Sequence, residues 1–426
     1  MVSKKSEQNL LAPSPANEDH PLKAFGWDVR KPMWSLALLL MGFTLYSGTL
    51  FAGIFVGPEY SVWTDLLGSI AIGNSILGIY AAALAYIAAK SGLSTALMAR
   101  FSFGKVGSQW VEFMLSFTQI SWYVWGSAII AQLLNKLLGI PIFLNWLTIL
   151  VCTYLFCITA YIGYRVMDWL SRIAVSTALF AMFWSVAIVM TKVGGMESLQ
   201  ALAPARQLAY GQILTFVIGL FIGGATQIYQ NPYFPKIRIQ DVIIAIVAFF
   251  FANGFLMLCG AFNALFYNNV DIVQMIGNQE LLFAGLLLLF VNMWTTQDNP
   301  LAAFSAISAE VFHRNKRMAF FVGSAILALL LSLGGIYKML IPYLILLGTF
   351  IPPIGGVIVS DYWLVHQGKF PDPEKARSAF NWAGISAYGV ASAIALFSPG
   401  IKPINGIVAA IIIHFLASKI IAYLSS

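Results

Sequence analysis

The chain has 426 residues, of which 59% are hydrophobic and only 10% are charged. Soluble domains average about 25% charged residues, so this composition excludes an ordinary soluble protein and indicates one that crosses a membrane many times. The net charge of +7 does not indicate a nucleic-acid partner, because the Lys and Arg residues lie between the apolar segments rather than in one patch.

Twelve apolar segments follow a polar N-terminal tail, residues 1–32, that has no signal-peptide core. A membrane-spanning helix needs roughly 20 mostly apolar residues. The short piece 270–278 is too polar to span and is expected to form a surface helix on the outer side. The predicted spans are 33–56, 65–90, 106–136, 141–163, 168–192, 211–230, 240–267, 280–312, 318–335, 338–364, 380–399 and 404–424.

The distribution of basic residues predicts the orientation, because cytoplasmic loops carry an excess of Lys and Arg. With the N-terminus placed inside, 19 of the 24 Lys and Arg residues fall in inner tails and loops, and 5 fall in outer ones. We therefore expect both termini in the cytoplasm, which agrees with an even number of spans.

Nothing in the sequence indicates catalysis. Cys152, Cys157 and Cys259 lie within apolar runs and are expected to be buried hydrophobes rather than a disulfide or metal set. His414 stands alone in the twelfth span, and the other histidines lie in loops or tails. No nucleophile set and no phosphate-binding glycine loop is visible, so we expect neither an enzyme nor an ATP-driven pump.

Two spans carry glycine pairs at mid-depth. The first has Gly42 and Gly48 around Thr44 and Ser47, and the sixth has the run Gly219–Gly224. Glycine-interrupted helices at matching places in two halves are typical of inverted-repeat transporters that bind their substrate at the midplane. We therefore expect breaks in spans one and six and, by the same symmetry, a pairing of span three with span eight.

Span three carries polar groups at the depth of the expected site. Gln119 and Trp122 are three residues apart and share one helix face. An amide can bond the edge of a planar heterocycle, and an indole can stack on its face. Alternatively, Gln119 joins helices and Trp122 is core. Phe221, in the middle of the span-six glycines, could cover the opposite face of the ring or be an ordinary core residue.

Span eight holds the densest set of polar residues. Polar groups at this depth cost several kcal/mol unless they are paired, so the cluster indicates a functional site. Uncharged hydroxyl and carbonyl oxygens suit a hard monovalent cation. We expect this stretch to hold a coupling ion and one wall of a substrate pocket. Its members are Asn292, Thr295, Thr296, Gln297, Asp298 and Asn299.

Asp298 has three possible roles: proton carrier, cation ligand, or structural anchor bonded to nearby amides. It lies two residues past Thr296 and would point away from the threonine pair on a helix. This spacing favours the anchor.

Five motifs along the chain carry a resemblance to a known family. They are Gly73–Tyr80, Ala99–Gly104, Thr118–Trp122, Trp294–Asn299 and Ile351–Val357. Together they resemble the cytosine permease branch of the nucleobase:cation symporter-1 family, and the similarity runs from about residue 33 to the end. The motif Ala99–Gly104 is similar to the loop between spans two and three of that branch.

The resemblance implies an all-α membrane protein of the bacterial inner membrane with a leucine-transporter-like fold. Two inverted five-helix repeats, 33–192 and 211–364, would be followed by two extra helices in 380–426. The implied activity is sodium-coupled import of a nucleobase by alternating access. We expect a monomer in membrane lipid, with Na⁺ as the coupling ion.

The resemblance also implies roles for individual residues. Gln119 would bond the base, Trp122 would stack on it, and Phe221 would cover its other face. The sodium would lie between backbone carbonyls of the broken first span and oxygens of span eight. The implied sodium ligands come from Gly42, Leu45, Tyr46, Asn292, Thr295 and Thr296.

Three departures from the family pattern border the expected pocket. Relatives have serines where Leu220 and Gly223 stand, and an Asn where Gln297 stands. We expect Leu220 to add bulk, Gly223 to open space and Gln297 to reach one methylene further. Cytosine is the first candidate, and hydroxymethylpyrimidine, uracil or a purine is the alternative. An amino-acid symporter of the same fold is the rival from another substrate class.

Overall fold

The structure is a computed structural model of the chain. It describes residues 45–59, 65–162, 164–201, 209–227, 247–269, 317–335, 339–371 and 378–424, together with 271, 274–275, 285, 287, 289–294 and 296–297.

Helices account for nearly all of the described residues. In chain order they are α2 (Ser47–Val56), α3 (Leu67–Ser91), α4 (Thr95–Phe103), α5 (Gly107–Leu138), α6 (Asn145–Ile162), α7 (Tyr164–Val193), α8 (Met196–Gln200), α9 (Tyr210–Thr226), α11 (Gly254–Tyr267), α14 (Arg317–Leu333), α15 (Leu340–Phe350), α16 (Pro352–Ser360), α17 (Trp382–Phe397) and α18 (Lys402–Leu424). A π-helical segment, Ala248–Asn253, leads into α11, and another, Asp361–Val365, continues α16.

The predicted spans coincide with these helices wherever they are described. Within the described ranges, three helical stretches are long and apolar enough to cross a bilayer on their own: Leu67–Ser91, Leu340–Val365 and Lys402–Leu424. The first predicted span is described only from Leu45 onward and the eighth only in part, while the expected surface helix 270–278 falls almost wholly outside the description. Cys152 and Cys259 are buried, as predicted.

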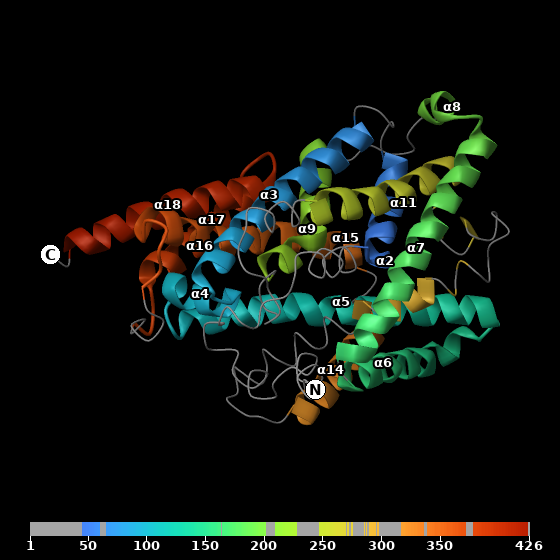
Figure 1. Ribbon diagram of the computed structural model, residues 1–426, viewed down its shortest axis with the longest axis horizontal. Helices are drawn as coiled ribbons and strands as arrows, with labels where there is room; N and C mark the ends of the chain where they lie inside the picture. Colours follow the sequence, from blue (N-terminus) through green and yellow to red (C-terminus); the bar gives the residue numbers. More distant parts are fainter. Residues whose placement is uncertain are drawn as a thin grey trace, which may run out of the picture.

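Helix α5 runs through the middle of the arrangement and is contacted from several sides (Figure 1). Helices α6 and α14 pack on it and on each other, and α9 meets it beside the candidate site. Helix α9 in turn packs against α3 and α15. At one end of the molecule α18 packs along α16 and α17 and projects beyond them, with the C-terminus at its tip (Figure 1).

Glycines set the close approach of α2 to α11. A Cβ atom at Gly53 would lie 1.9 Å from the carbonyl oxygen of Met257, and one at Gly260 would lie 2.1 Å from that of Leu50. Any larger residue would therefore force the two helices apart. Small residues stabilise membrane helix pairs in this way, because packing rather than water exclusion drives their association.

A chain of buried polar side chains joins α2, α3 and the π-helical segment before α11. Thr49 Oγ1 donates to Asn253 Oδ1 at 2.9 Å, and Asn253 Nδ2 donates to Asn74 Oδ1 at 2.6 Å. All three side chains are fully buried. Each amide satisfies the next, so the chain offsets the cost of placing polar groups away from water.

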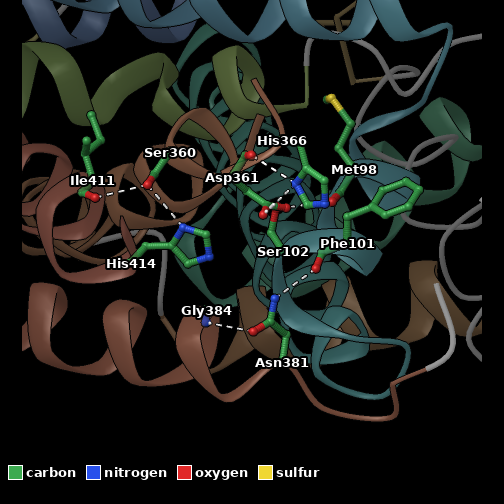
Figure 2. A network of polar contacts seen from close by, with 10 residues as sticks. All are labelled: Met98, Phe101, Ser102, Ser360, Asp361, His366, Asn381, Gly384, Ile411 and His414. Atoms are coloured by element: carbon green, nitrogen blue, oxygen red, sulfur yellow. Dashed lines mark hydrogen bonds and ion pairs between the residues drawn. The ribbon is translucent and has the colours of Figure 1, made fainter. Parts of the chain in front are cut away.

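The connection between spans two and three differs from the expected loop. Residues Thr95–Phe103 form the buried helix α4, whose first turn is capped by Ser94 Oγ accepting from the Leu97 N–H at 3.3 Å. Asn381, at the start of α17, donates through its side chain to the Phe101 carbonyl at 3.0 Å and through its backbone to Phe103 at 2.9 Å (Figure 2). Helix α4 is thereby attached to the C-terminal helix pair.

A second set of contacts holds α4 to the end of α16. Ser102 Oγ donates to Asp361 Oδ2 at 2.9 Å, and His366 Nδ1 lies 3.2 Å from Asp361 Oδ1 (Figure 2). His414, which stands alone in its span, lies 3.1 Å from Ser360 Oγ of α16. This contact joins α18 to α16, and the sequence does not reveal it.

Hydrogen bonding to Asp361 raises the pKa of His366 above its usual value, against the opposing effect of burial. The protonated ring is therefore favoured in the folded protein. Its contribution to stability is fully present below the ordinary histidine pKa of about 6.5, and it is lost as the pH rises through the raised folded value.

We predict that His366→Asn removes this part of the pH dependence. The asparagine amide keeps a donor near Asp361 but does not titrate. Melting temperatures of the purified protein, measured from below to above neutral pH, should fall less steeply on the alkaline side for the variant than for the wild type. Parallel curves for the two proteins would show that His366 contributes no pH-dependent stability.

Candidate functional site

The first described residues of span one form a helix start rather than a continuous helix. Leu45 and Tyr46 are non-helical, with Tyr46 extended at φ −89° and ψ 135°, and α2 begins at Ser47. Both Leu45 and Tyr46 are buried. A helix beginning here agrees with the predicted break, while Gly42 lies outside the described residues.

The side chain of Asn292 satisfies the backbone at this helix start. Its Oδ1 accepts from the Ser47 N–H at 3.0 Å and from the Ser47 hydroxyl at 2.5 Å. Its Nδ2 donates to the Leu45 carbonyl at 3.0 Å. One amide from span eight thus provides both a donor and an acceptor to an irregular, buried piece of span one.

Thr296 lies one turn beyond Asn292 and completes a group of oxygens. Its hydroxyl donates to the Asn292 carbonyl at 2.9 Å and to that of Met293 at 3.0 Å. A donating hydroxyl still keeps lone pairs for a cation. Three of the predicted sodium ligands, from Leu45, Asn292 and Thr296, therefore belong to residues linked by hydrogen bonds. Thr295 and Asp298 lie outside the described residues.

The sequence predicts a break in span six at its glycines, but helix α9 does not break there. It continues through Gly219–Gly224 and ends at Thr226, with Gln227 as its C-cap. The backbone groups of Gly219–Gly224 are therefore not freed for a ligand. The glycines serve packing instead, since a Cβ at Gly219 would lie 2.0 Å from the Leu344 carbonyl oxygen on α15.

Gly223 also differs from expectation, because it does not open free space. A Cβ at this position would lie 2.8 Å from Thr118 Oγ1 and 3.2 Å from Thr118 Cβ. The volume left by the missing side chain is thus filled by Thr118 from α5. Leu220 and Phe221, on the same stretch of α9, are both buried.

Trp122 packs against three aromatic neighbours in edge-to-face contacts. Tyr46, Trp125 and Tyr343 meet it at centroid distances of 5.6, 5.9 and 6.1 Å and at interplanar angles of 86°, 86° and 78°. Edge-to-face contacts of this kind are favourable and fix the plane of a ring. Tyr343 is itself fixed by donating to the Thr118 carbonyl at 3.2 Å.

Buried glutamines form two further hydrogen bonds, one of them to Tyr46 of this aromatic group. Gln119 Nε2 donates to Gln227 Oε1 at 2.5 Å, and Gln297 Nε2 donates to the Tyr46 hydroxyl at 3.0 Å. Gln119, Gln227 and Gln297 are 6%, 7% and 0% exposed. Within the described part of the chain, Gln227 Nε2 and Gln297 Oε1 have no hydrogen-bond partner.

A glycine on α5, Gly126, leaves the space that the Gln297 side chain occupies. A Cβ at Gly126 would lie 1.7 Å from Gln297 Nε2, so the amide lies directly against the α5 backbone. Its extra methylene is thus accommodated by a missing side chain on the facing helix.

Sequence reasoning assigned no role to Gln227, Tyr46's hydroxyl or Tyr343. Gln227 had one available signal: it is an amide directly after an apolar, glycine-rich run. The two tyrosines resemble any other aromatic residue of an apolar span, so only the fold places them beside Trp122 and Gln297.

The chain is similar to known proteins in both sequence and fold. Residues 32–417 match a family model described as permease for cytosine/purines, uracil, thiamine, allantoin. The chain is 31% identical to the cytosine permease of Escherichia coli (strain K12) over 393 residues, which cover 92% of each chain.

Solved structures give the fold. The inward-facing conformation of Mhp1 matches with a TM-score of 0.83 at 16% identity, covering 97% of this chain and 94% of that one. A Na⁺-coupled sialic acid symporter matches with a TM-score of 0.63 at 14% identity, covering 93% and 91%. The predicted all-α, leucine-transporter-like membrane fold is thereby confirmed.

Proposed function

Because the chain belongs to this family of permeases for cytosine, purines, uracil, thiamine and allantoin, we propose that it is a sodium-coupled symporter that imports a nucleobase. It is a transporter of the nucleobase/cation symporter family and not an enzyme. Cytosine is the first candidate substrate, and a related pyrimidine or a purine is the alternative.

The arrangement around Trp122 supports a flat, uncharged substrate. The indole plane is fixed by three edge-to-face contacts, and buried amides bond each other and Tyr46, one of the rings that contact Trp122. A stacked ring with polar edges would use both features. Mhp1, a member of the same family, has been seen with bromovinylhydantoin bound, which is also a planar heterocycle with polar edges.

The oxygens around the start of α2 support sodium as the coupling ion. The carbonyls of Leu45 and Asn292 and the hydroxyl of Thr296 are neutral oxygen ligands of the type that a hard monovalent cation accepts. Bound there, the ion would offset the irregular backbone at Leu45–Tyr46 and link α2 to span eight. Its binding would then favour a substrate that contacts the same two spans.

An amino-acid substrate is the rival. It would require its carboxylate to meet freed backbone amides or a helix N-terminus. The Ser47 N–H at the start of α2 is already bonded to Asn292, and α9 is continuous through its glycines. These contacts favour the nucleobase. We further propose that the protein lies in the bacterial inner membrane, as its resemblance to a bacterial permease implies, and that both termini lie in the cytoplasm, as the distribution of basic residues predicts.

We predict that Trp122→Ala weakens nucleobase binding by about one to two decades. Stacking on an aromatic ring contributes roughly 1–3 kcal/mol per base, and about 1.4 kcal/mol corresponds to tenfold in affinity. The measurement is thermal stabilisation of the purified protein in sodium by a panel of nucleobases and amino acids. Trp122→Phe should retain part of the affinity.

Trp110→Ala provides the matched control on the same helix, because Trp110 is 53% exposed. It should bind the panel as the wild type does. Normal binding by Trp122→Ala would move the pocket elsewhere, and stabilisation of the wild type by an amino acid but by no base would overturn the proposed function.

A second prediction concerns the ion. Thr296→Ala should raise the sodium concentration needed for half-maximal uptake, because it removes one neutral oxygen from the ion site. Thr215→Ala is the control, since Thr215 is another buried helix threonine and its hydroxyl donates within α9, to the Gly211 carbonyl at 2.7 Å. If Thr296→Ala keeps the wild-type sodium dependence in well-expressed protein, Thr296 is no ligand and proton coupling becomes the leading account.

A further inference from the structure

Gln227 carries an unused hydrogen-bond donor in the middle of the protein. Its side chain is 7% exposed and its Nε2 has no partner among the described residues. A buried amide nitrogen left unpaired costs about 1–3 kcal/mol. A ligand that supplies the missing acceptor would remove this cost.

The contact of Gln227 with Gln119 fixes which atoms of the pair are available. Gln119 Nε2 donates to Gln227 Oε1 at 2.5 Å, so the Gln227 acceptor is already used and its two N–H groups remain. Gln119 alone could rotate to suit either a donor or an acceptor. Paired with Gln227, it keeps this bond only in the orientation shown or if both amides rotate together.

A complementary unpaired acceptor belongs to Gln297, which bonds Tyr46 of the aromatic group. Gln297 Oε1 is buried and unpartnered, while the Gln297 nitrogen donates to Tyr46 at 3.0 Å. Gln297 lies against Gly126 of α5. Gly126 is seven residues after Gln119, which is two helical turns or about 10 Å along one face. Trp122 lies between these two levels.

We infer that Gln227 is a specificity-determining residue, and that the site selects rings that direct a carbonyl oxygen toward Gln227 and an N–H toward Gln297. This inference rests on the proposed function, since it names the class of nucleobase that the same site takes. A ring with an amino group in place of the carbonyl would set donor against donor. Buried sites that bond a polar edge reject such analogues strongly, because their own groups remain unpaired.

This preference predicts different affinities for two bases that differ in having a carbonyl or an amino group at one ring position. Cytosine can be compared with 2,4-diaminopyrimidine, and hypoxanthine with adenine, at an alkaline pH where the diamino ring is neutral. Each compound is titrated against purified full-length protein in sodium, alone and in competition with whichever base of the panel binds. The readout is the ratio of dissociation constants within a pair, which a merely structural role of Gln227 would not change.

We expect the wild type to prefer the oxo member by about tenfold or more. Gln227→Leu removes both the donor and the acceptor and should bring the ratio close to one. Gln227→Glu keeps an acceptor for Gln119 but replaces the donor with a second oxygen, so it should shift the ratio toward the amino member. Gln109→Leu, the same change at an exposed position of α5, should leave the ratio as in the wild type.

Different results would contradict the role of Gln227 and the proposed nucleobase function. If bases bind but the oxo-to-amino ratio is the same in the wild type, Gln227→Leu and Gln227→Glu, then Gln227 does not determine specificity and the nucleobase function stands. A wild-type preference for the amino members also overturns the inference alone. If no base of the panel stabilises the wild type, the proposed function and the inference are both wrong.

Discussion

Backbone polar groups inside a bilayer must be satisfied within the protein, and the fold of the site depends on how this requirement is met where α2 begins. Leu45 and Tyr46 precede α2 in a non-helical conformation and are buried. Asn292 bonds the backbone on both sides of this point, at Leu45 and at Ser47. Because Asn292 belongs to span eight, the irregular segment cannot move without that span.

The rest of the site is arranged around this joint by close helix packing. Glycines bring α2 against α11 and α9 against α15 through backbone-to-backbone approach. Helix α5 then supplies Gln119, Trp122 and Gly126 from one face, opposite α9 and span eight. Buried polar side chains in this packing bond one another, as in the series of hydrogen bonds from Thr49 through Asn253 to Asn74.

The sequence predicted the parts of the fold that follow from hydropathy and missed those that follow from contacts between helices. Apolar length located the spans, and polar residues at mid-depth pointed to Gln119, Asn292 and Gln297. The glycines of span six were taken for a break because glycine weakens a helix, whereas here they admit a neighbouring backbone. The pairing of Gln119 with Gln227 joins residues 108 positions apart, and no local pattern encodes it. Helix α4 was missed because Thr95–Phe103 is too short to register as a span.

The contact of Gln297 with Gly126 constrains how this transporter can diverge. Even one methyl group at position 126 would occupy the space of the Gln297 amide, 1.7 Å away, and so separate it from Tyr46. A shorter side chain at 297 would leave a void against the bare backbone of α5, together with an unpaired tyrosine hydroxyl. Neither position can therefore vary freely by itself. Adapting this end of the pocket to another ring would therefore alter the packing at both positions at once.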